Sequence, residues 1–217
     1  GGLRLEEMTP PKTVAIAVPD ETRPAPIKEL LPVMRKRIHR AFPNLRPEDI
    51  TIVVASGLHP PLDDAGLRRI VPEGVAPGCR IISHDALHSP MKDFGRTSRG
   101  TPVRINACFA EADLRMLIGT IDPHQFVGFT GGAKAVVIGC GSDGTIESNH
   151  ALMFHDRAKV ANIDGNPVRM DIDEAGRMIG LQMIVNVVLD GEKRPVRILA
   201  GEPEAVFARS RNGQAFD

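Results

Sequence analysis

The chain of 217 residues contains no tyrosine and no tryptophan, so it lacks the usual platforms on which single-strand nucleic-acid binders stack bases. Its charges cancel, with 27 Lys and Arg against 27 Asp and Glu, and net charge therefore favours neither nucleic acid nor an anionic membrane as a partner. No apolar run approaches the ~20 residues needed to span a bilayer, and no signal-peptide pattern opens the sequence. We expect neither nucleic acid nor membrane among its partners.

Cysteine is also scarce: there are three, odd in number and widely spaced, at Cys79, Cys108 and Cys140. This usage fits reduced thiols in a cytoplasmic protein better than a disulfide framework. The sequence begins with Gly1-Gly2 rather than methionine and stops at Phe216-Asp217, shortly after a strand-like run and with no closing element. We therefore expect residues 1–217 to form a single domain of a longer protein.

What the chain does contain is a regular alternation of apolar runs and helical patterns. Ile27–Ala41 predicts a helix, because its apolar residues recur at helical spacing, and Val168–Ile179 is a weaker helix candidate after Asn166-Pro167. Runs of four to seven apolar and β-branched residues predict strands buried on both faces, at Thr13–Val18, Ile50–Ala55, Arg80–Ser83, Leu114–Gly119, Ile184–Leu189 and Val196–Ala200. The alternation predicts a Rossmann-like α/β fold, with a largely parallel sheet flanked by helices.

Polar clusters follow three of these strands directly. Asp20 and Arg23 come after the first, His59 after the second, and His124 after the fourth. The carboxyl ends of parallel strands share one edge, where open α/β folds bind their ligands. We expect these four side chains to be neighbours in an active site at that edge.

Each cluster also has an ordinary structural interpretation. Arg23 suits capture of a carboxylate or phosphate, with Asp20 holding its guanidinium in place, but a turn aspartate that caps backbone beside a surface arginine is the commoner arrangement. His59, in a loop stiffened by two prolines, suits acid–base work or a hydrogen bond to backbone. His84, which Asp85 could orient, is interpreted as structural, and so is Cys140. His39, His88 and His155 are expected to face solvent.

A glycine-rich turn leads into Lys134. The stretch Thr130-Gly131-Gly132-Ala133-Lys134 fails the Walker A pattern, because no glycine directly precedes the lysine and Ala135 stands where Ser or Thr should be. Its amides can still form an anion nest. Apolar residues follow Lys134, so its amine is expected to be partly desolvated and nucleophilic, with phosphate binding as the alternative.

A short helix over Thr145–Met153 is predicted to carry Asn149-His150, with Ser142, Asp143 or Thr145 as N-cap. Imidazole is a common ligand of nickel, zinc and copper, but one histidine does not make a metal site. No Cys/His pair has zinc-finger spacing.

Taken together, these motifs resemble the nickel-dependent lactate racemase family. The resemblance covers essentially the whole chain and depends on the order and spacing of its motifs. These are Asp20–Pro24, Ser56–His59, Thr97–Pro102, Pro123–Lys134, Asn149-His150 and Asn186–Leu189. Two positions depart from the family pattern: Pro60 follows the loop histidine, and Ala133 stands where arginine is common.

The resemblance implies racemisation or epimerisation of a 2-hydroxy acid, lactate by default, by hydride transfer to and from a nickel-pincer nucleotide. Lys134 would carry this cofactor covalently through a thioamide, and His150 would bind its nickel. His59 and His124 would be the two acid–base residues.

The remaining site residues follow from the same resemblance. Asp20 and Arg23 would lie in the cofactor and substrate pocket, and Gly131 and Gly132 would let backbone approach the cofactor. The family also implies two kinds of partner: cofactor biosynthesis proteins, and a C-terminal domain, absent from this chain, that closes over the site.

Two other functions remain open on the residues alone. One is a zinc-dependent hydrolase that uses His59, His124 and His150. The other is a non-catalytic anion- or nucleotide-binding module built on Gly131 and Gly132.

Overall fold

The computed structural model describes residues 4–192 and 194–211. Its centre is a six-stranded sheet in the order β10-β9-β6-β1-β2-β3. The strands are β1 (Val14–Pro19), β2 (Ile50–Ala55), β3 (Arg80–Ser83), β6 (Leu114–Ile121), β9 (Met183–Leu189) and β10 (Pro195–Gly201). Every neighbouring pair is parallel except β9 and β10. The predicted α/β fold with a largely parallel sheet is confirmed, and all six predicted strands are present.

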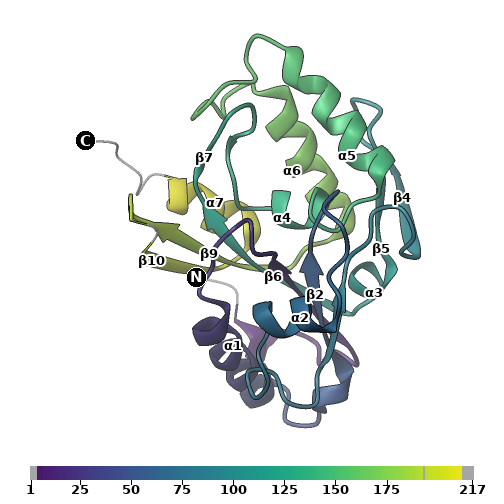
Figure 1. Cartoon of the computed structure of the whole chain (residues 1–217), viewed down its shortest axis with the longest axis vertical. Coiled ribbons are helices and arrows are strands. Elements are labelled where there is room, and N and C mark those ends of the chain that lie inside the picture. The colour runs from purple at the N-terminus through teal and green to yellow at the C-terminus, as the bar shows by residue number, and fades with distance from the viewer. Residues whose placement is uncertain (1–3, 193, 212–217) are drawn as a thin grey trace.

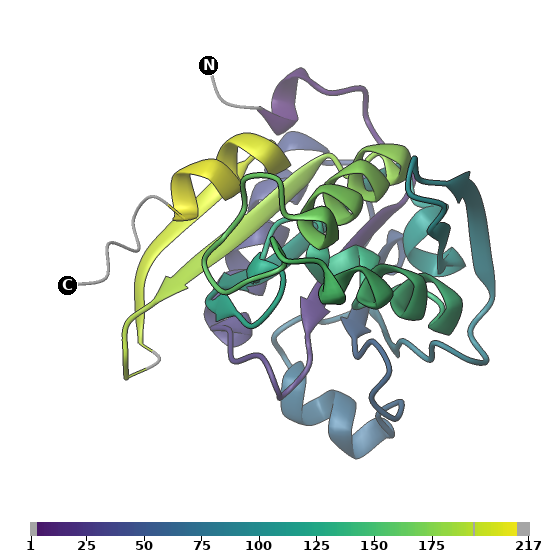
Figure 2. The ribbon, with the colours of Figure 1, turned by 90° about the horizontal axis from the view of Figure 1, so that it is seen from above.

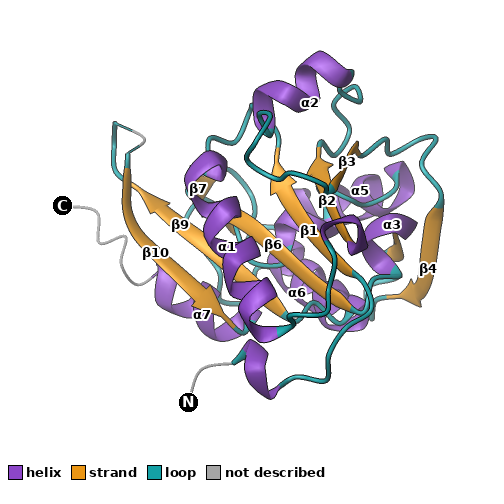
Figure 3. Ribbon diagram, turned by 90° about the horizontal axis from the view of Figure 1, so that it is seen from below, coloured by secondary structure: helices purple, strands orange, loops and turns teal. Residues whose placement is uncertain are grey.

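Helices cover both faces of this sheet (Figures 1 and 2). Helix α1 spans Ile27–Ala41, as predicted, and crosses one face (Figure 3). The longer helices α5 (Asp143–His150) and α6 (Pro167–Ile179) lie on the other face, with the short helices α3 (Ala107–Ala110) and α4 (Lys134–Val137). A 3-10 turn, η3 (Ala151–Phe154), continues α5, so the helix predicted over Thr145–Met153 changes type at its end.

Strand β1 shows why both faces need this cover. All six of its residues are buried. Ala15 and Ala17 pack in the core beneath α4 and α6, whereas Ile16 and Val18 pack in the core beneath α1. Because strand side chains alternate between faces, a continuous apolar run requires two apolar layers.

Several short elements lie outside the sequence prediction. They are α2 (Asp64–Ile70), the antiparallel ribbon β4 (Met91–Arg96) and β5 (Pro102–Asn106), the small hairpin β7 (Pro123–His124) and β8 (Gly128–Phe129), and the 3-10 turns η1 (Leu5–Glu7) and η2 (Pro47–Asp49). The expectation of no element after the last strand was wrong: α7 (Pro203–Arg211) follows β10 and contacts β9 and β10. Among the described residues, no helix is long and apolar enough to span a membrane. All three cysteines are free thiols.

Candidate active site

A cavity of about 260 Å³ opens at the carboxyl edge of the sheet, where β1, β2 and β6 end. The residues that line it include seven of the eight predicted site residues: Asp20, Arg23, His59, His124, Gly131, Lys134 and His150. The predicted clustering of Asp20, Arg23, His59 and His124 is therefore confirmed. Gly132 is the exception, because it does not line this cavity.

Asp20 and His59 form a close pair at the mouth of the cavity. Oδ2 of Asp20, which is 7 % exposed, lies 2.6 Å from Nδ1 of His59. The other carboxylate oxygen accepts hydrogen bonds from the Thr22 amide at 3.1 Å and the Thr22 hydroxyl at 2.6 Å. An ionised carboxylate only accepts hydrogen bonds, so it places the imidazole proton on Nδ1 and leaves Nε2 free to accept a proton. The His59 side chain is 58 % exposed, which keeps Nε2 accessible to a ligand.

Arg23 behaves differently from the expectation that Asp20 would hold its side chain. The carboxylate of Asp20 is occupied by Thr22 and His59, and the link between Asp20 and Arg23 is a backbone hydrogen bond of 3.2 Å. Within the described part of the chain, the exposed Arg23 guanidinium has no side-chain hydrogen bond or ion pair. It is free to meet an anionic group of a ligand.

The Gly131–Gly132 turn carries the backbone from β8 into α4. Both glycines have positive φ, 77° and 60°, which side-chain-bearing residues rarely adopt. A Cβ on Gly131 would lie 3.1 Å from the Thr120 carbonyl oxygen and closer still to Ile121. A Cβ on Gly132 would instead lie 2.5 Å from the guanidinium of Arg169. The turn thus meets the cavity through Gly131 and packs against α6 through Gly132.

Lys134 follows this turn and is partly buried in the cavity. Burial, followed by the positive charges of Arg23 and Arg169, lowers the pKa of its amine to about 8. At neutral pH roughly a tenth of such amines are unprotonated, several hundred times the fraction expected for an ordinary lysine. The predicted desolvated lysine is therefore present.

Two further imidazoles, His124 and His150, flank an aromatic ring. Phe126 makes edge-on contacts with both, with ring centroids 4.7 Å from His124 and 5.2 Å from His150. Burial lowers the pKa of His124 to about 3, helped by the charges of Lys134, Arg23 and His150. Burial and the charge of Lys134 also lower the pKa of His150. Both imidazoles are consequently held in the neutral form, the form that ligates metals and accepts protons.

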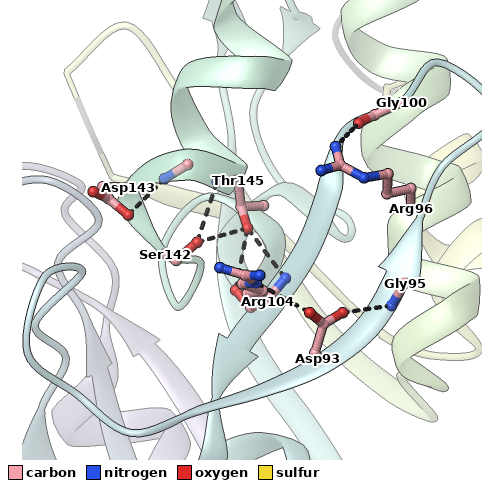
Figure 4. Close-up of polar contacts among 9 residues, drawn as sticks. Asp93, Gly95, Arg96, Gly100, Arg104, Ser142, Asp143 and Thr145 are labelled. Atoms are coloured by element: carbon pink, nitrogen blue, oxygen red, sulfur yellow. Dashed lines mark hydrogen bonds and ion pairs between the residues drawn. The ribbon is translucent and has the colours of Figure 1, made fainter.

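Helix α5 places His150 because its amino end is fixed to strand β5 (Figure 4). Ser142 is the N-cap, as one of the predicted alternatives, and its hydroxyl accepts from the Thr145 amide at 3.2 Å. The amide of Ser142 donates to the Arg104 carbonyl at 2.9 Å, and the Arg104 amide donates to the Thr145 hydroxyl at 3.1 Å. Capping and strand contact together set the axis along which His150 is presented.

Asn149, next to His150, points into the protein instead of the cavity. Its amide donates to Asp171 at 2.8 Å and to the Val168 carbonyl at 3.2 Å, and Asp171 also accepts from the Thr97 hydroxyl at 2.5 Å. The Asn149-His150 motif and the Thr97–Pro102 motif therefore share one buried carboxylate on α6, which fixes the carboxyl end of α5.

The residues interpreted as structural lie outside the cavity lining. His84 is fully buried, with Nε2 2.9 Å from the Gly141 carbonyl and Nδ1 3.2 Å from the Asn106 amide, so Asn106 orients it and not Asp85. Burial lowers its pKa. Burial also raises the pKa of the Cys140 thiol to about 12, which makes it unreactive. His39, His88 and His155 are exposed, as expected.

The positions of the three cavity histidines test the zinc hypothesis. Among residues 4–192 and 194–211, no group of three or more His, Cys, Asp and Glu residues is arranged to hold a metal ion. His59, His124 and His150 therefore do not form the three-ligand set of a hydrolytic zinc site. A metal held by His150 would need further ligands beyond a His, Cys, Asp and Glu cluster of the described residues.

Sequence reasoning missed two residues that shape the site. Phe126 lies within the Pro123–Lys134 motif, but nothing in its spacing indicated that it packs between two histidines. Arg169 lies on α6, far along the chain from the Gly131–Gly132 turn, and its pattern resembled that of a surface residue.

Comparison with known proteins gives one consistent result. A family model described as "Lactate racemase N-terminal domain" matches residues 3–161. Lactate racemase from Lactiplantibacillus plantarum is 34 % identical over 94 % of this chain and 49 % of its own length. Lactate racemase from Thermoanaerobacterium thermosaccharolyticum is 29 % identical over 94 % of this chain and 48 % of its own.

Solved structures agree. The lactate racemase apoprotein of Thermoanaerobacterium thermosaccharolyticum matches with a TM-score of 0.91 and 28 % identity, covering 98 % of this chain and 51 % of that one. A Thermotoga maritima protein shares the fold, with a TM-score of 0.74 and 20 % identity. The chain spans about half the length of the curated relatives that it matches. From the family match, the site and the fold together, this chain belongs to the lactate racemase N-terminal domain family.

Proposed function

We propose that this chain is the cofactor-bearing domain of a nickel-dependent racemase or epimerase of 2-hydroxy acids, with lactate as the default substrate. The observation that carries the proposal is the Lys134 amine. Its pKa is lowered to about 8, and it lies in a cavity that three imidazoles also line. Such a lysine is suited to covalent attachment of a cofactor.

The residues present fit a nickel-pincer nucleotide. Lys134 would hold it covalently, and the neutral imidazole of His150 would be the protein ligand to nickel. Gly131 lines the cavity without a side chain, so backbone can approach the bound group closely. When bound, the cofactor supplies the acceptor for the α-hydride of the substrate.

His59 is suited to take the hydroxyl proton of one enantiomer. Its free Nε2 would accept the proton, and the Asp20 carboxylate, 2.6 Å from Nδ1, would stabilise the imidazolium that forms. Arg23, exposed at the same mouth, would bind the substrate carboxylate.

His124 would serve the other enantiomer, whose hydroxyl lies on the opposite side. In the chain alone burial opposes its protonation most strongly, and the charges of Lys134 and Arg23 add to that effect. Attachment through a thioamide makes the Lys134 nitrogen neutral, and a bound carboxylate offsets Arg23. Both changes would raise the pKa of His124 by removing charge contributions that add to the effect of burial.

The curated relatives are about twice as long as this chain, and the exposure of the site indicates what their additional length contributes. The His59 side chain is 58 % exposed and Arg23 is also exposed, so water reaches both. We propose that the cofactor is made by dedicated biosynthesis proteins, and that a C-terminal domain completes and covers the site.

The test is cofactor loading. The chain is co-expressed with cofactor-making proteins, and its intact mass, adduct position and nickel content are measured. We expect an adduct on Lys134 with nickel, loss of both in Lys134→Ala, and retention of both in Lys159→Ala, which removes an exposed lysine outside the cavity. An unmodified mass without nickel, alongside a known lactate racemase that loads normally, would refute the proposal.

A further inference from the structure

Arg169 is a buried cation outside the cavity lining. It lies in the first turn of α6 and is only 1 % exposed. Its Nε and Nη2 donate to the two oxygens of Asp173 at 3.0 Å and 2.6 Å, a forked pair. A buried charge is tolerated only when its donors are paired, so this geometry defines where the guanidinium can lie.

The third contact of Arg169 reaches the backbone of the turn that precedes Lys134. Nη1 donates to the carbonyl oxygen of Gly131 at 3.1 Å. Gly132 packs so closely that a Cβ there would lie 2.5 Å from Nη2. The Gly131–Gly132 turn is therefore tethered to the guanidinium through Gly131, three residues before Lys134.

The aromatic ring of Phe207, in α7, makes a further contact with the Arg169 guanidinium. The guanidinium carbon lies 3.6 Å from the ring centroid of Phe207 in α7, a cation–π contact. Arg169 thus joins α6, α7 and the turn. The turn itself has two glycines of positive φ, a conformation open to glycine but not a rigid one, so its position depends on the contacts around it.

We propose that Arg169 is a positioning residue that holds the Gly131–Gly132 turn against α6 and so fixes where the Lys134 side chain enters the cavity. The inference rests on the proposed role of Lys134. The groups that face the Lys134 amine are Arg23, His124 and His150 across the cavity and Arg169 behind the turn.

The test measures the pH midpoint of Lys134 acetylation by acetic anhydride in the chain without cofactor, mapped by peptide mass spectrometry. Arg169→Lys keeps the positive charge but cannot reproduce the fork, the Gly131 tether and the stacking together. We expect the midpoint to rise by about one pH unit, because a loosened turn lets water reach an amine whose low pKa is due mainly to burial.

Two controls separate positioning from general stability. Arg177→Lys alters an exposed ion pair between α6 and Glu204 and leaves the turn untouched. Ile38→Val lowers stability from the opposite face of the sheet. We expect neither to move the midpoint.

A folded Arg169→Lys variant whose Lys134 midpoint equals that of the wild type would overturn the proposal. If that variant does not fold, Asp173→Asn decides. It removes one of the two hydrogen bonds between Arg169 and the partly exposed side chain of Asp173. A raised midpoint supports the proposal, and an unchanged or lowered midpoint overturns it. Failure of cofactor loading would refute the covalent role of Lys134 and leave this result standing.

Discussion

Gly128→Ala should destabilise the protein more than a glycine substitution at the same backbone angle in open space. Gly128 has a φ of 81°, and a Cβ there would lie 2.3 Å from the backbone carbonyl oxygen of Asn162. Gly100 has a φ of 84° with nothing within 4 Å of its Cβ position, so Gly100→Ala is the matched control. Both substitutions carry the left-handed penalty, about 1 kcal/mol. Only Gly128→Ala adds overpacking against backbone, about 1–3 kcal/mol.

We therefore expect the free energy of unfolding to fall by about 1 kcal/mol in Gly100→Ala and by about 2–4 kcal/mol in Gly128→Ala. Urea denaturation with equal m-values in both variants measures the difference. Gly128 also pairs with His124 in the β7–β8 hairpin, so the packing defect lies directly beside the site. Equal losses in the two variants would refute the reasoning, because they would mean that the segment around Asn162 moves away freely.

Three further results are expected. Under the proposed racemase function, Asp20→Asn should lower kcat of the cofactor-loaded protein by about a hundredfold or more with little change in KM, since the carboxylate orients the His59 imidazole through Nδ1; an unchanged kcat would contradict this role. Arg23→Gln should raise the pKa of Lys134 above about 8, because it removes a nearby positive charge. The pH midpoint of Lys134 acetylation measures this, and a lowered midpoint would contradict the expectation. Burial lowers the pKa of His84. Over a range of pH below about 6.5, His84 is therefore protonated in the unfolded chain but neutral in the folded chain. The stability should therefore fall as the pH drops below about 6.5, by at most about 1.4 kcal/mol per pH unit for this group. His84→Gln should flatten that slope in denaturation curves measured between pH 5 and 8, and an identical slope would count against it.

Much of the fold could be predicted because burial on two faces leaves a clear pattern. The apolar spacing of Ile27–Ala41 matched α1 at both ends, and Asn166-Pro167 marked the start of α6 with its N-cap and first residue. The ribbon of β4 and β5 could not be predicted this way. Strand β4 is largely exposed and has no apolar run to mark it.

The candidate site could be predicted in outline for a topological reason. Residues that follow parallel strands meet at one edge, which brought Asp20, His59 and His124 together from separate parts of the chain. Their individual partners could not be predicted. Asp20 was expected to hold Arg23, three residues away, yet it pairs with His59 at a separation of 39 residues.

The sequence by itself determined the alternation of strands and helices, the residue types available for chemistry and the edge of the sheet where they gather, because these depend on local periodicity and connectivity. Only the tertiary structure decided which side chains pair and which protonation states they hold. The low pKa of Lys134 depends on its burial and on Arg23 and Arg169, which approach from a β1 loop and from α6. Burial and charge at such a point are set by segments distant in sequence, so no local pattern records them.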